Sequence, residues 1–262
     1  MGGGTFSLDP VPVDPVLTAH RSITSPIPAP GTREILERLD VVESRSMHGQ
    51  LPLIWDRAVD FSVLDHVGNR WIDMTSTIFV ANVGHSNPRV VEAMRDALDR
   101  PLVSCYAYGN ELRARYLERL VEFAGPPFEK AFLLSAGTEA TEAALKLMRM
   151  HGAEQGKRRS GLLCVEGNWH GRTLGAQMMS SNLEQRAWIG YQDPDIHHIP
   201  FPYPWALEGR SSEDFLAGAI ATLEADGVDP ERDLCGVMLE TFQGWGAVFY
   251  PADFVRAIEA FC

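Results

Sequence analysis

The chain has 262 residues, of which 45% are hydrophobic and 22% charged, so it can bury a large core in one or two domains. Asp and Glu number 35 against 23 Lys and Arg, and the net charge of −12 argues against general binding to nucleic acid or anionic membranes. No apolar run reaches the length of about 18 residues that a membrane span requires.

The amino-terminal half begins with a proline-rich stretch, residues 1–31, that contains three consecutive glycines. This composition predicts an extended or disordered arm outside any core. Residues 32–44 place aliphatic side chains on one face and predict an amphipathic helix. Alternating residues 59–64, a turn at 65–69 and a return over 70–74 predict a hairpin.

Helices are predicted next from Asn87-Pro88 to about Leu98 and over residues 110–123. From there short apolar runs alternate with helical patterns. The predicted strands are 131–134, 162–165 and 237–239, and the predicted helices are 138–151, 214–225 and 252–261. Strands that alternate with helices predict an α/β fold with a largely parallel sheet.

The four cysteines, at 105, 164, 235 and 262, are far apart and form no C-x-x-C pair. Two of them lie in apolar runs, which predicts reduced, buried thiols in a cytoplasmic protein. Residues 1–30 lack the charged start and the apolar run of a secretory signal.

The first segment whose residues could bind a ligand is 133–140 (Leu-Leu-Ser-Ala-Gly-Thr-Glu-Ala), where an expected buried strand leads directly into a helix. The first backbone N–H groups of a helix lack intrahelical partners, so a phosphate can bind there. Gly137 allows close approach and Thr138 can add a hydroxyl. The alternative is an ordinary helix cap with Thr138 as the N-cap. The spacing matches neither a dinucleotide fingerprint nor a nucleoside-triphosphate loop.

Two further segments follow predicted strands, where open α/β sheets bind ligands. Residues 166–173 (Glu-Gly-Asn-Trp-His-Gly-Arg-Thr) offer the flat face of Trp169 to a planar ring and the guanidinium of Arg172 to a carboxylate. Packing and a salt bridge are the alternative. Residues 240–246 begin with Glu240, which can pair an arginine or a substrate amine, or can be a loop acid exposed to water.

Together and in this order, the three segments resemble class III pyridoxal-phosphate aminotransferases. Residues 65–73 (Asp-His-Val-Gly-Asn-Arg-Trp-Ile-Asp) and 83–88 (Val-Gly-His-Ser-Asn-Pro) resemble amino-terminal segments of the same family. The resemblance runs from about residue 40 to residue 262.

The resemblance implies the aspartate-aminotransferase fold (fold type I), a mostly parallel sheet flanked by helices. Residues 32–75 would form the amino-terminal part of a small domain, and residues 76–262 a large domain that binds pyridoxal 5'-phosphate (PLP). Members of the family act as homodimers.

The resemblance also assigns roles. Gly137 and Thr138 would hold the cofactor phosphate, and Trp169 would stack on the pyridine ring, where the family usually has Phe or Tyr. Arg172 matches an arginine that binds a substrate carboxylate. Glu240 matches an acid that masks a second arginine.

Two groups that the family needs follow the Glu-x-x-Gln-Gly segment: an aspartate that keeps the pyridine nitrogen protonated, and the Schiff-base lysine. The sequence ends at Cys262 before both, and Lys130, Lys146 and Lys157, its only lysines, resemble neither. We therefore expect the front part of an enzyme, incomplete at the carboxyl end and inactive by itself.

The activity implied for the parent enzyme is the transfer of an amino group between an amine or amino acid and a 2-oxo acid. A racemase or decarboxylase of the same fold is an alternative, because fold does not fix chemistry. A non-catalytic fragment that binds a phosphate ligand or a protein partner is another.

Overall fold

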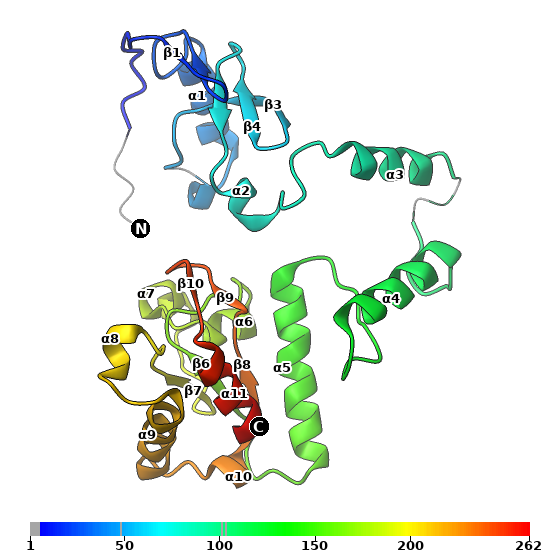
Figure 1. Cartoon of the computed structure of the whole chain (residues 1–262), viewed down its shortest axis with the longest axis vertical. Helices are drawn as coiled ribbons and strands as arrows, with labels where there is room; N and C mark the ends of the chain where they lie inside the picture. The colour runs from blue at the N-terminus through cyan, green and yellow to red at the C-terminus, as the bar shows by residue number, and fades with distance from the viewer. Residues whose placement is uncertain (1–5, 48, 101, 103) are drawn as a thin grey trace. The chain divides into compact units, whose positions relative to one another are not determined.

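The computed structural model describes residues 6–47, 49–100, 102 and 104–262. The chain divides into two compact units, residues 1–114 and 115–262 (Figure 1). This division falls later in the sequence than residues 75 and 76, where we expected a small domain to give way to a large one. The assignment of 32–75 and 76–262 to those two domains stays a prediction.

The first unit contains a five-stranded antiparallel sheet in the order β1-β2-β5-β4-β3. Its strands are β1 (Val16–Leu17), β2 (Ser22–Ile23), β3 (Trp55–Val59), β4 (Ser62–Asp65) and β5 (Arg70–Ile72). The predicted hairpin is present as β4 and β5. The expected single strand over residues 59–64 is wrong, because Asp60 adopts a φ of 54° and a turn there separates β3 from β4.

The expectation that residues 1–31 lie outside any core is wrong for their second half. Strand β2 pairs with β5 through Ser22 and Arg70, and Ile23 and Ala29 are buried. Composition alone misses this, because the segment obtains its hydrogen bonds from a strand almost 50 residues away.

The helical elements of this unit and of the unit boundary are α1 (Thr32–Val42), the 3-10 turn η1 (Arg45–Met47), α2 (Ser76–Phe79), α3 (Pro88–Leu98) and α4 (Glu111–Ala124). Three of them, α1, α3 and α4, agree with the sequence patterns, and the two short elements, η1 and α2, were not predicted. Helix α3 begins as predicted, because the Asn87 side chain accepts a hydrogen bond from Arg89 N at 3.1 Å. The short α2 is a left-handed turn, with positive φ at all four residues.

The second unit is built on a parallel sheet in the order β7-β6-β8. Its strands are β6 (Gly161–Val165), β7 (Ile196–Ile199) and β8 (Leu234–Met238), with a small hairpin of β9 (Phe242–Gln243) and β10 (Val248–Phe249). The prediction of an α/β fold with a parallel sheet is confirmed.

Helices cover both faces of this sheet (Figure 1). The helices of this unit that follow α4 are α5 (Gly137–Glu154), α6 (Leu174–Met179), α7 (Leu183–Arg186), α8 (Pro204–Leu207), α9 (Ser212–Ala225), α10 (Pro230–Asp233) and α11 (Ala252–Phe261), with the 3-10 turn η2 (Ala187–Ile189). In the described part of the chain, no helix combines the length and the apolar character needed to cross a bilayer.

Strand β6 is the centre of the core, and its residues alternate between the two faces as a strand requires. Leu163 and Val165 pack in a cluster with side chains of α9 and α11. Leu162 and Cys164 pack in a second cluster with side chains of α5 and α6. Burial raises the pKa of the Cys164 thiol to about 12.

Two strand predictions need correction. Residues 131–134 pair with no strand among the described residues, and Phe132 is 72% exposed. An apolar run forms a strand only where a neighbouring strand supplies hydrogen bonds, and the β7-β6-β8 sheet supplies none here. The predicted strand 237–239 begins earlier, at Leu234, and β7 was not predicted.

The turn between β4 and β5 is held by two buried polar side chains. Asp65 accepts hydrogen bonds from Asn69 N at 2.8 Å and from Asn69 Nδ2 at 2.8 Å. Asn69 Oδ1 in turn accepts the backbone N–H of Thr24 at 2.9 Å. Asn69 therefore joins the proline-rich segment to the hairpin.

We predict that Asn69→Ala lowers the free energy of unfolding of the first unit by about 2–4 kcal/mol, because Thr24 N and the Asp65 carboxylate lose a partner while buried. Urea unfolding followed by circular dichroism measures this. Asn82→Ala, at an exposed asparagine of the same unit, serves as the control and should cost less than about 1 kcal/mol. Equal losses in the two variants would contradict the assignment.

Candidate functional site

Three loops meet at the carboxyl edge of the parallel sheet, because β6, β7 and β8 all end there. The fully buried side chain of Gln243 connects them. Its Nε2 donates to Glu166 O at 3.2 Å in the loop after β6. Its Oε1 accepts the hydroxyl of Tyr203 at 2.8 Å in the loop after β7. Gln243 itself follows β8, so one amide fixes all three loops.

The loop after β6 is also tied to the first turn of α5. Thr141 Oγ1 donates to His170 O at 2.7 Å, and the hydroxyl oxygens of Thr138 and Thr173 lie 2.8 Å apart. A Cβ at Gly171 would overlap the Thr138 side chain, so only glycine permits this approach. The first two segments singled out in the sequence are therefore in contact.

The loop after β6 also contacts the third segment. Glu240 Oε2 accepts the backbone N–H of Trp169 at 3.0 Å, and Glu240 is half-buried. Burial raises the pKa of its carboxyl above the usual value, against the effect of hydrogen bonds from the backbone of Trp169 and Gly244. The alternative of a loop acid exposed to water is therefore wrong.

Trp169 and Arg172 lie against each other. The guanidinium carbon of Arg172 is 5.3 Å from the centroid of the Trp169 ring, within the range of a cation–π interaction. Trp245 meets the same indole edge-on at 6.0 Å. Arg172 is exposed and forms no ion pair with any described residue, so it makes the packing contact but lacks the salt bridge of the structural alternative.

A hollow of about 200 Å³ adjoins Trp169. Its other lining residues come from the loop after β6, from the end of α6 and from the segment after β9: Gly167, Asn168, Ser180, Ser181, Asn182 and Trp245. The indole is therefore accessible from one side to a small planar group.

The amino end of α5 is open. The Glu139 carboxylate accepts hydrogen bonds from Ser135 N at 2.9 Å and Ala136 N at 3.2 Å. The helix begins at Gly137 with Ala136 as N-cap, so the prediction of Thr138 as N-cap is wrong. Within the described residues, the N–H groups of Gly137 and Thr138 donate to no acceptor.

Space is also available beside Gly137, because a Cβ at this position would meet nothing within 4 Å. Two free backbone N–H groups at the positive end of an 18-residue helix suit a phosphate group. The donor set therefore fits a phosphate-bearing ligand, with Trp169 available to a ring.

Sequence reasoning missed the role of Glu142. Although its spacing of four residues from Lys146 favours a surface ion pair, Glu142 Oε1 accepts the hydroxyl of Thr173 at 2.5 Å and the backbone N–H groups of Gly175 and Ala176 at 2.9 and 3.0 Å. Lys146 is exposed. The i, i+4 spacing of helical ion pairs indicates only contacts within one helix, and Thr173 lies 31 residues after Glu142.

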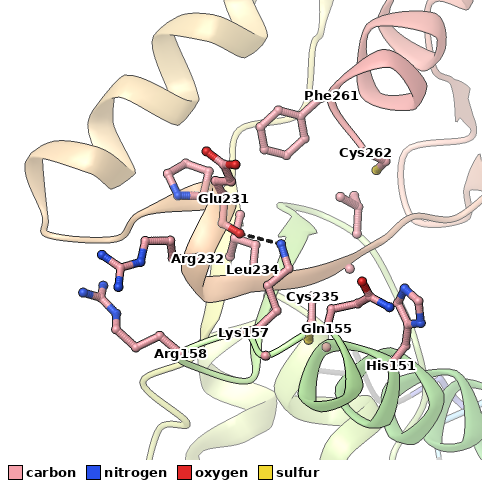
Figure 2. A pocket seen from close by; sticks show the side chains of 15 residues that line it. His151, Gln155, Lys157, Arg158, Glu231, Arg232, Leu234, Cys235, Phe261 and Cys262 are labelled. Carbon is pink, nitrogen blue, oxygen red and sulfur yellow. Dashed lines mark hydrogen bonds between the residues drawn. The ribbon is translucent and has the colours of Figure 1, made fainter.

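A larger hollow of about 790 Å³ lies at the carboxyl end of α5 (Figure 2). It is lined by residues 151, 152, 155–158, 230–232 and 234–237 and by Phe261 and Cys262, with Lys157 Nζ donating to Glu231 O at 2.5 Å. None of the three motif segments, residues 133–140, 166–173 and 240–246, lines it. These segments converge at the opposite end of this helix.

Comparison with known proteins identifies the family. The profile of the family described as aminotransferase class-III matches residues 44–262. The acetylornithine aminotransferase of Nitrosomonas europaea is 29% identical, over 82% of this chain and 50% of that protein. The ornithine aminotransferase of Saccharomyces cerevisiae is 30% identical, over 81% of this chain and 49% of that protein.

A solved structure supports the fold. The taurine:2-oxoglutarate aminotransferase from Bifidobacterium kashiwanohense, in complex with PLP and glutamate, superposes with a TM-score of 0.76 at 23% identity, over 88% of this chain and 53% of that one. The expected PLP fold type I is confirmed. The chain belongs to the class III aminotransferase family and spans about half the length of the curated relatives it matches.

The buried imidazole of His170 makes the stability of this region depend on pH. It is 4% exposed, its backbone N–H donates to Ser180 Oγ at 2.8 Å, and its Nε2 has no partner among the described residues. Burial, with a smaller contribution from His198, lowers its pKa to about 4. The folded protein therefore keeps this imidazole neutral at pH values where an unfolded chain protonates it.

Because the pKa is lower in the folded state, stability should fall as the pH decreases from about 6.5 to about 4, by roughly 3 kcal/mol from His170 alone. Chemical unfolding at several pH values measures this. His170→Gln should remove part of the slope, and His151→Gln, on the exposed surface of α5, should retain it. A slope unchanged by His170→Gln would rule out this origin.

Proposed function

We propose that the protein to which these residues belong is a PLP-dependent transaminase, which moves an amino group between an amine or amino acid and a 2-oxo acid. The observation that carries the proposal is the convergence of three separate segments at one sheet edge. There hydrogen bonds join the start of α5, the loop that carries Trp169 and Arg172, and the segment that begins at Glu240, and the Arg172 guanidinium lies over the Trp169 indole.

The cofactor would be held by residues of this chain. Gly137 and Thr138 would bind its phosphate, since their backbone donors have no acceptor among the described residues and open space lies beside Gly137. Trp169 would stack on its ring, on the indole face opposite Arg172 or after Arg172 has moved. When bound, PLP supplies the electrophilic aldehyde and the electron-withdrawing ring on which amino transfer depends.

Arg172 and Glu240 would act on the substrate. Arg172 is exposed and has no carboxylate partner among the described residues, so its planar fork is available to a substrate carboxylate. The Glu240 carboxylate accepts a hydrogen bond from the backbone N–H of Trp169. Its raised pKa reflects a burial cost that a positively charged partner would relieve, which supports a role in pairing an arginine.

Two wider properties belong to the same proposal. We infer a homodimer, supported by large side chains that the chain leaves exposed, including Tyr106, Tyr108 and Phe123. We also infer a cytoplasmic location, supported by the presence of all four cysteines as free thiols, the form that a reducing compartment maintains.

The activity is tested on the full-length protein with PLP, 2-oxoglutarate and a panel of amines that includes ornithine, 4-aminobutyrate and taurine. We expect glutamate to form with at least one donor. Racemisation or decarboxylation of the amino acid without any glutamate would instead favour the alternative chemistry of the same fold.

Trp169→Ala should weaken PLP binding about 2- to 12-fold, because ring stacking contributes about 0.5–1.5 kcal/mol beyond buried area. Trp169→Phe should bind nearly as well as the parent protein. Equilibrium dialysis with absorbance detection gives both affinities. Trp55→Ala, at an exposed indole on β3 in the first unit, is the matched control. If Phe and Ala at position 169 behave alike, stacking is not the role of this residue.

Arg172→Lys should raise the KM of carboxylate-bearing donors about tenfold while PLP absorbance persists, because an ammonium cannot reproduce a bidentate fork. Steady-state kinetics with paired donors, one with and one without the carboxylate, provides the comparison. A KM that is unchanged for every acidic donor would return Arg172 to a purely structural role on the Trp169 ring.

A further inference from the structure

A chain of three side chains connects α5 to the loop in front of α6. Thr138, in the first turn of α5, has its hydroxyl oxygen 2.8 Å from that of Thr173. The Thr173 hydroxyl is 2.5 Å from Glu142 Oε1, one helical turn further along α5. The proposed function uses Thr138 and leaves the other two without a role.

The direction of these hydrogen bonds is determined by Glu142. Its Oε1 already accepts the backbone N–H groups of Gly175 and Ala176, so this oxygen is an acceptor. The single hydroxyl proton of Thr173 therefore goes to Glu142. The Thr173 oxygen can then only accept at its other contact, so the hydroxyl proton of Thr138 goes to Thr173.

The packing leaves Thr138 in this arrangement. Its oxygen also faces the backbone N–H of Thr173 at 3.4 Å, and Gly171 packs directly on its side chain. The Thr138 hydroxyl thus donates its proton to the Thr173 oxygen. The backbone N–H of Thr138 has no acceptor among the described residues.

We propose that Glu142 and Thr173 are positioning residues, which keep the Thr138 hydroxyl donating its hydrogen bond to Thr173 in the loop before α6. A phosphate at the amino end of α5 is then held by backbone N–H groups and not by this hydroxyl, contrary to the contribution expected from the sequence. The inference rests on the proposed function for the identity of the phosphate, which is that of PLP. The same relay holds the loop that carries Trp169 against α5.

The test compares the affinities of PLP and pyridoxal, whose ratio isolates the phosphate group, with inorganic phosphate as a competitor. Thr138→Val removes the hydroxyl and should leave the ratio within about twofold. Glu142→Ala should weaken both ligands, because the loop that carries Trp169 loses its anchor. Glu142→Gln keeps an acceptor oxygen at the same place and should restore binding. Thr222→Val, on the exposed surface of α9, is the matched control for loss of a hydroxyl.

A tenfold or larger fall in the ratio for Thr138→Val, the size expected for a lost hydrogen bond to a charged group, would overturn the inference and leave the proposed function intact. Failure of the parent protein to bind PLP would instead count against the proposed function.

Amide hydrogen exchange in the ligand-free protein tests the hydrogen-bond chain of Thr138, Thr173 and Glu142 without any ligand. Glu142→Ala should raise exchange at Gly175 and Ala176 at least tenfold, and Glu142→Gln and Thr138→Val should not. Equal exchange in all three variants would overturn the inference.

Discussion

The arrangement of the site depends on the buried amide of Gln243. An amide offers a donor and an acceptor without a charge, so it can join the Glu166 carbonyl to the Tyr203 hydroxyl in a fully enclosed position. Loss of either bond would leave a buried polar group without a partner, at a cost of about 1–3 kcal/mol. Trp169 lies three residues after Glu166, and Glu240 lies three residues before Gln243. The hydrogen bonds of the Gln243 amide therefore help to position both side chains. Gly167 approaches this amide so closely that a Cβ there would overlap it.

The Gln243 amide and the Tyr203 hydroxyl, which join the loops of the site, are both neutral. Burial also disfavours the charged forms of the nearby His170 and Glu240 side chains. His170 has its pKa lowered to about 4, and the pKa of Glu240 is raised. Two positive features face outward, the end of the α5 dipole and the exposed Arg172 guanidinium, and the exposed Glu139 carboxylate lies beside the first of them. In a chain with a net charge of −12, these positive features would favour an anionic ligand at this edge of the sheet under the proposed function.

Sequence patterns predicted the elements that carry their own local signals. Helix α3 starts at an asparagine followed by proline, and α11 (Ala252–Phe261) has the bounds that its periodicity indicates. Patterns failed where the partner is distant: residues 131–134 are apolar yet unpaired among the described residues, and the segment around Ile23 is proline-rich yet joins a sheet. For the candidate site, Gly137, Trp169 and Glu240 were proposed because their residue types suit ligand chemistry, and the structure brings their segments into contact. Glu142 and Gln243 were not singled out, since their function is set by contacts between segments that are far apart in the sequence.

The central position of Cys164 gives the protein a built-in reporter. Its thiol is fully buried in β6, and its high pKa keeps it protonated and unreactive at neutral pH. Alkylating reagents reach it only when β6 separates from its neighbours, and that same event releases the loops that Gln243 holds together. The slow alkylation rate of this thiol, read against that of the exposed Cys262, therefore measures how often the whole sheet edge comes apart, with no ligand and no introduced label.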